Sequence, residues 1–133
     1  MRVVIDSNVW ISALVFGGKP RQIFEKCVKN GDEIIVSSEL IGEIRRIIKH
    51  KFTDFINDFE DLLMVLNQFL VYYQIGENPV NVCRDPNDNF LLELAIKARA
   101  KIIISGDKDL LEIKNYKSIK IITPSLFSST RQG

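Results

Sequence analysis

The chain has 133 residues, enough for one domain with a substantial core and too few for two. Apolar residues make up 46% and charged residues 26%, a balance typical of globular proteins that excludes an intrinsically disordered chain. The formal net charge of +1 gives no bulk signal for a nucleic-acid or membrane partner, so partners have to be inferred from local patterns.

Neither a membrane segment nor a secretory leader is expected. The longest apolar run near the start, residues 9–16, is about half as long as a bilayer requires, and no basic leader precedes it. The two cysteines, Cys27 and Cys83, lie in apolar surroundings without a Cys or His at metal-ligand spacing, which favours buried free thiols over a disulfide. We therefore expect a cytoplasmic protein without a membrane partner.

The first predicted element is a buried parallel strand over residues 2–6. Its β-branched run ends in Asp6, as expected of a strand whose carboxyl end opens on a site. Ser7 and Asn8 follow as N-cap residues for a helix over residues 9–16. Asp6 is therefore the first candidate ligand.

A Gly-Gly-Lys-Pro break at residues 17–20 ends this helix and lacks the spacing of a phosphate-binding P-loop. Pro20 is expected to open a second helix over residues 21–30, which Gly31 closes. A second strand follows at residues 33–37. Strand, helices and strand in this order imply a parallel pair with a right-handed crossover.

Ser38 is the expected N-cap of the next helix, whose buried face is formed by Leu40, Ile41, Ile44, Ile47 and Ile48. Glu43 lies at the margin of this face, whereas Glu39 points to water. Arg46 falls on the same margin, with Lys49 nearby. Arg46 has two open interpretations, an ion pair with Glu43 one turn away and a contact with a nucleic-acid phosphate.

Residues 53–70 are predicted to form one amphipathic helix. Its inward side chains are expected to be Phe55, Phe59, Leu62, Leu63, Leu66, Phe69 and Leu70. So many large apolar groups usually indicate core, and the alternative is an exposed remainder used for dimerisation. A third strand is predicted at residues 71–75, followed by a loop at residues 76–79.

Asp85 and Pro86 are predicted to be the N-cap and first residue of another helix, and this capping role suffices to explain Asp85 and is favoured over metal binding. Asp88 lies in the first turn, where the helix dipole favours an anion. The buried face of this helix is marked by Leu91, Leu94, Ala95 and Ala98. Asp88 lies near that face and Glu93 points away, so Asp88 is expected to face the sheet.

A fourth strand is predicted at residues 101–105, with a turn at Gly106. Asp107 then begins a short helix. One interpretation makes Asp107 an N-cap, with Asp109 as a first-turn acid. The other makes Asp107 a ligand at the carboxyl end of the strand.

The last predicted strand covers residues 119–123, and Pro124 ends it. The tail over residues 128–133 is expected to fray. We therefore predict a single domain over residues 1–127.

Alternating strands and helices predict a mostly parallel sheet with helices on both faces, whose ligands bind beyond the carboxyl ends of the strands. Four acids are placed to meet there: Asp6, Glu43, Asp88 and Asp107. Two carboxylates ~5 Å apart repel by about 3 kcal/mol at an effective dielectric constant near 20. Several such pairs would rival the stability of a domain, about 5–15 kcal/mol, so a bound cation is expected.

A ligand set of oxygens without His or Cys selects a hard ion, Mg²⁺ or Mn²⁺. Such an ion lowers the pKa of a bound water and neutralises the oxygens of a phosphodiester during in-line attack. The predicted chemistry is hydrolysis of a phosphate ester bond.

Four motifs, in this order, resemble the PIN domain over almost the whole chain. They are Val-Val-Ile-Asp6-Ser-Asn8, the Ser38 helix with Glu43, Asp85-Pro-Asn-Asp88 followed by Leu91-Leu-Glu-Leu-Ala95, and Ser105-Gly-Asp107-Lys-Asp109-Leu. The resemblance implies a three-layer α/β fold, with a central parallel sheet of about five strands in the order 3-2-1-4-5 and helices on both faces. It also implies an endoribonuclease that depends on Mg²⁺ or Mn²⁺.

The resemblance assigns roles to individual residues of this chain. The family's four acidic positions, catalytic and metal-binding, are matched by Asp6, Glu43, Asp88 and Asp107. Asn8 matches a polar position beside the first acid, and Asp85 and Asp109 are expected to support the site. Candidate contacts with RNA phosphates are Arg46, Lys49 and Lys108.

Stand-alone PIN domains of this size resemble the VapC-like toxin half of toxin–antitoxin pairs, which implies an RNA substrate, a small antitoxin and a homodimer. The alternative is a PIN-like module that binds RNA or protein with little intrinsic cleavage. A haloacid-dehalogenase-type phosphatase would need a second Asp where Asn8 stands, and a catalytic triad fails because His50 is the only histidine. A phospho-receiver domain would need an Asp after its third strand, where Gly76 and Glu77 follow Ile75.

Overall fold

The computed structural model describes residues 1–75 and 86–130, which build one six-stranded sheet in the order β3-β2-β1-β4-β6-β5. The strands are β1 Arg2–Ile5, β2 Glu33–Val36, β3 Leu70–Tyr72, β4 Ile102–Ile104, β5 Asn115–Tyr116 and β6 Ile119–Ile122. Strands β3, β2, β1, β4 and β6 are parallel to one another, which confirms the expected order of five. The two-residue strand β5 was not predicted and pairs antiparallel with β6 at the sheet edge.

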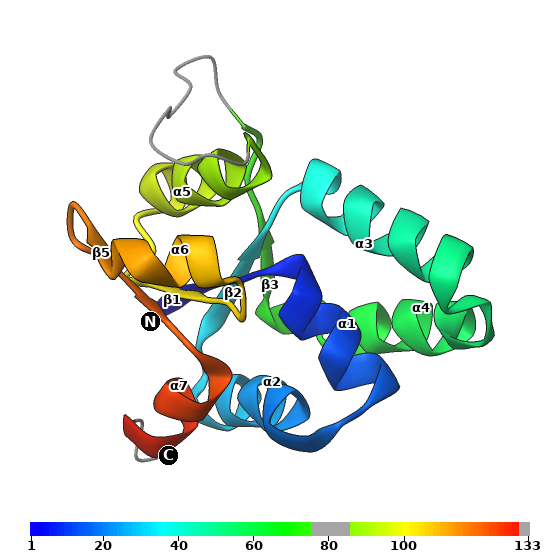
Figure 1. Cartoon of the computed structure of the whole chain (residues 1–133). Helices are drawn as coiled ribbons and strands as arrows, with labels where there is room; N and C mark the ends of the chain where they lie inside the picture. The colour runs from blue at the N-terminus through cyan, green and yellow to red at the C-terminus, as the bar shows by residue number, and fades with distance from the viewer. Residues whose placement is uncertain (76–85, 131–133) are drawn as a thin grey trace.

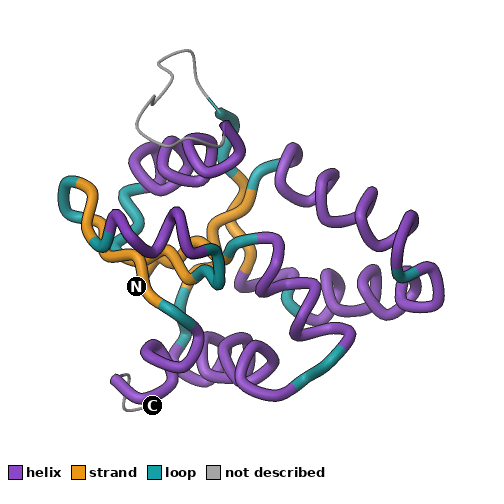
Figure 2. Tube along the Cα trace, viewed as in Figure 1, coloured by secondary structure: helices purple, strands orange, loops and turns teal. Residues whose placement is uncertain are grey.

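Helices cover the sheet on both sides (Figures 1 and 2). They are α1 Ser7–Val15, α2 Gly18–Asn30, α3 Ser38–Lys51, α4 Ile56–Val65, α5 Pro86–Ala98, α6 Lys108–Ile113 and α7 Pro124–Thr130. Helix α5 packs on β1, β2 and β4, while α2 and α7 lie on the opposite side of the sheet. Helices α3 and α4 lie side by side at one end of the molecule, and we call this pair the α3–α4 arm.

The central strands are apolar throughout because both faces of the sheet are covered. Val3, Val4 and Ile5 of β1 are fully buried. Ile5 is aligned with Ile104 of β4, and the backbone N–H of Asp6 donates to the carbonyl oxygen of Ile104 at 2.9 Å. This register places the residues that follow β1 and β4 next to each other at the carboxyl edge of the sheet.

Two helices are capped one residue earlier than predicted. Asp6, rather than Ser7 or Asn8, is the N-cap of α1. Ser37, rather than Ser38, is the N-cap of α3, and its hydroxyl accepts the N–H of Leu40 at 3.0 Å. Both strands end one residue earlier than expected, so the last predicted strand residue becomes the cap.

Helix α2 begins at Gly18 rather than at residue 21. Gly17 precedes it with φ of 72°, a conformation that favours glycine. Pro20 is then the third helical residue, where its missing N–H has no partner within the helix in any case. Gly31 ends the helix in the left-handed conformation, as predicted.

The prediction of one continuous helix over residues 53–70 is wrong. The segment forms a 3₁₀ turn at Thr53–Phe55, then α4, then a second 3₁₀ turn at Asn67–Phe69, and Leu70 already belongs to β3. Pairing of β3 with β2, which aligns Ile35 with Val71, overrides the helical pattern. The third strand is therefore Leu70–Tyr72 and not residues 71–75. Of the seven side chains expected to point inward, only Phe59 and Leu66 are buried.

Pro124 ends β6 as expected and also begins α7, which was not predicted. Phe127 of α7 is fully buried, and the ammonium group of Lys26 donates to the carbonyl oxygen of Ser128 at 2.7 Å. The first residues of the expected tail thus lie in a helix held against α2, and residues 131–133 lie outside the described part.

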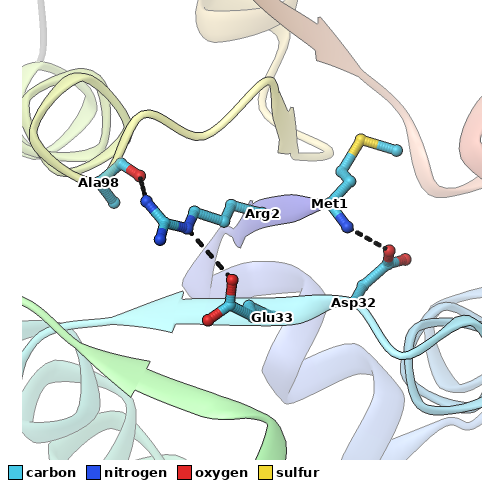
Figure 3. Close-up of polar contacts among 5 residues, drawn as sticks. All are labelled: Met1, Arg2, Asp32, Glu33 and Ala98. Carbon is cyan, nitrogen blue, oxygen red and sulfur yellow. Dashed lines mark hydrogen bonds and ion pairs between the residues drawn. The ribbon is translucent and has the colours of Figure 1, made fainter.

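Polar contacts fasten the start of β1 to its neighbours (Figure 3). The N-terminal ammonium of Met1 pairs with the buried carboxylate of Asp32 at 3.0 Å. The guanidinium of Arg2 donates to Glu33 at 3.2 Å and to the carbonyl oxygen of Ala98 at 2.9 Å. These contacts tie β1 to β2 and α5 at the amino edge, opposite the edge where Asp6 lies.

Cys27 is fully buried, as predicted, and Cys83 lies outside the described residues. Among the described helices none has the length and apolar character needed to cross a bilayer.

Candidate active site

Four acids from four separate segments line one pocket of about 130 Å³. Its walls are formed by Asp6, Ser7, Asn8, Glu43, Asp88, Phe90, Leu91 and Asp107. The β1–α1 junction supplies Asp6 and Asn8, and the β4–α6 junction supplies Asp107. Helix α3 supplies Glu43, and the first turn of α5 supplies Asp88. The structure thus brings together the four acids and the asparagine that the sequence singled out.

Asp6 is the most constrained of these acids. It is buried, its Oδ1 accepts the N–H of Ser7 at 2.7 Å, and its Oδ2 accepts the hydroxyl of Ser105 at 2.7 Å. Burial raises the pKa of Asp6 above its ordinary value, against the lowering effect of hydrogen bonds from the Ser105 hydroxyl and from the N–H and hydroxyl of Ser7, and the charge of Asp107 raises it further. Asp6 is therefore a desolvated carboxylate whose charged form a nearby cation would stabilise.

Ser105 connects two of the acids. Its fully buried hydroxyl donates to Asp6 and accepts the N–H of Asp107 at 2.9 Å. Ser105 belongs to the fourth motif of the sequence, but no role was predicted for it. Its position offered a signal, because Ser105 follows β4 as Asp6 follows β1, and aligned parallel strands place such residues side by side.

Asp107 is both the cap of a helix and part of the pocket wall. Its carboxylate caps α6 by accepting the N–H of Asp109 at 3.1 Å, and it also lines the pocket. Asn8 supports the turn that precedes Asp107, because its Oδ1 accepts the N–H of Gly106 at 3.4 Å. Asp109 and Lys108 are exposed and lie outside the pocket wall.

Asp88 is buried in the first turn of α5, with the apolar side chains of Phe90 and Leu91 beside it in the pocket wall. Its burial agrees with the predicted orientation toward the sheet, and Glu93 is partly exposed. Asp85, the predicted cap of this helix, lies outside the described residues.

The basic residues of α3 lie outside the pocket wall. Arg46 is exposed, and within the described chain it makes no ion pair with Glu43. Its neighbour Arg45 instead donates two hydrogen bonds to Glu60 of α4, at 2.7 and 2.9 Å. Lys49 is also exposed. The basic surface of α3 therefore stays accessible beside the pocket-lining Glu43.

The pocket offers the type of donor atom that a hard divalent ion prefers. These donors are oxygens only, and one of them belongs to the buried carboxylate of Asp6. Within the described residues, however, no three Asp, Glu, His or Cys side chains stand close enough together to hold a metal ion as placed. A small ion that retains several waters does not require direct contact with every carboxylate.

Comparisons with known proteins agree with this architecture. A family model described as PIN domain matches residues 2–109. An uncharacterized protein of Methanocaldococcus jannaschii, MJ1680, is 32% identical over 139 aligned positions, which cover 96% of this chain and 89% of that protein.

Two solved structures share the fold. VapBC2 from Rickettsia felis, bound to a DNA fragment from its promoter, superposes with a TM-score of 0.65 at 13% identity, covering 92% of this chain and 98% of that chain. The PIN domain endonuclease Utp24 superposes with a TM-score of 0.57 at 15% identity, covering 92% and 84%. At these identities the likeness concerns the fold, whereas the family model covers most of the sequence. The chain belongs to the PIN domain family.

Proposed function

We propose that this chain is an endoribonuclease that uses Mg²⁺ or Mn²⁺ to hydrolyse phosphodiester bonds of RNA. The observation that carries the proposal is the convergence of four carboxylates, from four segments, on the wall of one small pocket. Membership of the PIN domain family and the fold shared with a PIN domain endonuclease support it.

In this proposal the ion would be held by Asp6, Glu43, Asp88 and Asp107. When bound, it would supply an activated water and offset the charge of the phosphate. Asp6 is held in place by its two hydrogen bonds, so its carboxylate does not have to reorganise when the ion binds. Ser105 fixes Asp107 relative to Asp6. Phe90 and Leu91 exclude water from one wall of the pocket.

The exposed cations beside the pocket are proposed to hold the RNA strand. Arg46, Lys49 and Lys108 are available for contacts with phosphates, which position a nucleic acid without reading its sequence. Asn8 supports the site through the turn at Gly106. Asp109, whose N–H is held by Asp107, supports α6 from its first turn.

We also propose that the chain is the toxin of a toxin–antitoxin pair, with a small antitoxin as its partner and a homodimer as its working form. The fold shared with VapBC2 supports this assignment. The chain has only two cysteines in 133 residues, a usage that does not suggest a disulfide framework and suits a reducing compartment, so we place the activity in the cytoplasm.

The test is cleavage of a mixed RNA pool by the purified protein with Mn²⁺, with EDTA, and with the Asp6→Asn variant in Mn²⁺. Cleavage is expected only in the first reaction. Glu43→Gln and Glu39→Gln form a matched pair on α3, one inside the pocket wall and one exposed to solvent. Glu43→Gln should lose activity and Glu39→Gln should retain it. Equal cleavage in all reactions would refute the proposed site.

A second candidate is a module that binds RNA with little cleavage. It is favoured by one observation, that the described acids do not form a ready-made metal cluster. RNA retained under every condition without turnover would support it over the nuclease.

A further inference from the structure

The cations of this chain are unevenly distributed along the sequence. Residues 94–106 and 113–130 contain six Lys and Arg residues and no Asp or Glu. Since the whole chain carries a formal net charge of +1, the remaining residues together carry a net charge of −5. The near-neutral total therefore conceals two basic segments, and basic segments that a fold gathers on its surface are candidate contacts for a polyanion.

The sheet brings these two segments together beside the amino end of β4. The backbone N–H of Lys120 donates to the carbonyl oxygen of Lys101 at 2.9 Å, and the N–H of Ile121 donates to that of Lys114 at 2.8 Å. Figure 1 shows the α5–β4 turn and β5 on the same side of the molecule. We call five exposed residues of this region the distal basic surface: Arg99, Lys101, Lys114, Lys117 and Lys120.

Three of these cations have a backbone conformation that normally belongs to glycine. Among the described residues other than glycine, positive φ angles occur at Arg99 (56°), Lys114 (62°) and Lys117 (54°). Elsewhere in the described chain positive φ angles occur at glycines, which are Gly17, Gly18 and Gly31. A long side chain is strained in this conformation and glycine is not. Strain kept at three positions of one surface indicates that the charged side chains have a use there.

At two of these positions the local structure itself favours glycine. Arg99 follows α5 and closes a Schellman motif, in which its N–H donates to the carbonyl oxygen of Ile96 at 3.1 Å. The N–H of Ala100 donates to that of Ala95 at 2.9 Å, and the position of Arg99 in this motif is usually glycine. Lys117 is the first residue of the two-residue turn between β5 and β6, where a positive φ angle again favours glycine. The backbone alone therefore does not explain these cations.

The five cations are not neutralised within the described part of the chain. The ion pairs of that part lie elsewhere, at the start of β1 and in the α3–α4 arm. The acid next to the surface in sequence is Glu112 of α6, which is exposed. The ammonium of Lys117 lies 5.7 Å from the ring centre of Tyr116, so an aromatic ring accompanies the charges. Cations with an aromatic ring among them are typical of surfaces that bind single-stranded nucleic acid.

An anionic lipid surface is another polyanion, and it fits these residues less well. Segments that bind a membrane surface combine cations with large apolar side chains that enter the bilayer. None of the exposed large apolar side chains of the described residues belongs to the distal basic surface. RNA requires only contacts with phosphates, to which a ring such as that of Tyr116 adds stacking with a base.

We propose that the distal basic surface is a second RNA-binding surface, which holds phosphates of the strand beyond the part that enters the acidic pocket. RNA as the partner rests on the proposed function, whereas the gathering of the cations does not. The three residues of β4, about 10 Å long, separate Lys101 from the edge where Asp107 lies. Helix α6, on the way from the pocket to this surface, exposes Asp109 and Glu112. The surface is therefore separate from the pocket rim, and only RNA that extends past the pocket reaches it.

The first test is binding of poly(U) of about 20 nucleotides in EDTA, over a series of salt concentrations. The double variant Lys114→Gln, Lys117→Gln should bind about tenfold more weakly, and the slope of log affinity against log salt should fall by about 0.7 for each lost phosphate contact. The matched control is the double variant Lys19→Gln, Lys29→Gln, which removes two exposed cations of α2 and should bind as the wild type does.

The second test places glycine at the three strained positions. In the triple variant Arg99→Gly, Lys114→Gly, Lys117→Gly, relief of strain offsets the greater freedom of the unfolded chain. The melting temperature should therefore be at or above that of the wild type, while the affinity for poly(U) falls. A variant that melts clearly below the wild type, together with normal poly(U) binding by the glutamine variant, would assign these side chains to the fold and overturn the proposal.

Cleavage in Mn²⁺ separates this surface from the proposed nuclease. The glutamine variant should cleave an oligonucleotide of about 5 nucleotides as the wild type does, and one of about 20 nucleotides with unchanged kcat and a raised KM. Salt-dependent poly(U) binding without cleavage by the wild type would refute the nuclease and leave the surface standing. Equal poly(U) affinity in the wild type and both variants, or binding to phosphatidylserine vesicles without binding to poly(U), would overturn the surface.

Discussion

A single hydroxyl determines how two acids of the pocket are held. Ser105 donates to the Asp6 carboxylate and accepts the backbone N–H of Asp107, so one buried atom links the first acid to the backbone that carries the second. Its bond to Asp6 opposes the rise in pKa that burial imposes on that acid. Ser105 is therefore a positioning residue, since it acts through the acids rather than on the phosphate.

We predict that Ser105→Ala lowers Mn²⁺ affinity and RNA cleavage by about 10- to 100-fold, the usual effect of losing a group that orients a metal ligand. The pKa of Asp6 should rise further because the lowering hydrogen bond is gone. Calorimetric titration with Mn²⁺ measures the affinity, and the rate of RNA cleavage measures the activity. Ser105→Thr, which keeps the hydroxyl, is the control, and equal loss in both variants would indicate a packing defect instead.

Elements with a clear local pattern were predictable, and those set by contacts far along the chain were not. The strands follow from short β-branched runs, and the stripe of α5 predicted the inward position of Asp88. The prediction for residues 53–70 was wrong because their helical spacing does not reveal that Leu70 and Val71 pair with β2. Strand β5 has only two residues, too few for any pattern, and the N-caps moved by one residue because a strand end and a cap use similar backbone angles.

The two helices of the α3–α4 arm are joined by the Arg45–Glu60 pair, whose effect should depend on pH. The hydrogen bonds from Arg45 hold the pKa of Glu60 below its ordinary value. Because the pKa of Glu60 is lower in the folded chain, the unfolded chain binds more protons at pH values between the lowered pKa and the ordinary one. The stabilisation is therefore present above the ordinary glutamate pKa and is lost as pH falls through the lowered one.

We predict that Glu60→Gln lowers stability at neutral pH by less than about 1 kcal/mol, because both side chains are partly exposed to screening solvent. The difference from wild type should vanish in acid. Urea unfolding at a series of pH values measures it. A difference that persists below the lowered pKa would mean that the effect comes from packing rather than charge.

For the molecule as a whole, the sequence predicted which acids meet but not how they are held. Asp6 and Asp107 follow parallel strands, and strand topology alone brings such residues to one edge. The role of Ser105 depended on the register between β1 and β4, which no local pattern specifies. The burial that raises the pKa of Asp6 likewise arises only in the folded chain.

The charge of the assembled pocket leads to a prediction about metal removal. In EDTA, Asp107→Asn should melt at or above the wild-type temperature, because asparagine keeps the cap of α6 and removes the charge that acts on Asp6. Asp88→Asn should behave likewise. With Mn²⁺ at about 100 times its dissociation constant, the wild type should gain about 2.7 kcal/mol and the variants much less. Thermal melts measure both effects, and a variant clearly less stable in EDTA would show that capping outweighs repulsion.

The four acids of the pocket are not supported by the same parts of the fold. Asp6, Asp88 and Asp107 are mounted on the sheet and on the helix packed against it, whereas Glu43 comes from a helix braced mainly by other helices. A small molecule wedged beneath α4 would therefore withdraw one acid while leaving the other three in place. An inhibitor of the proposed nuclease need not compete with RNA or carry a metal-chelating group.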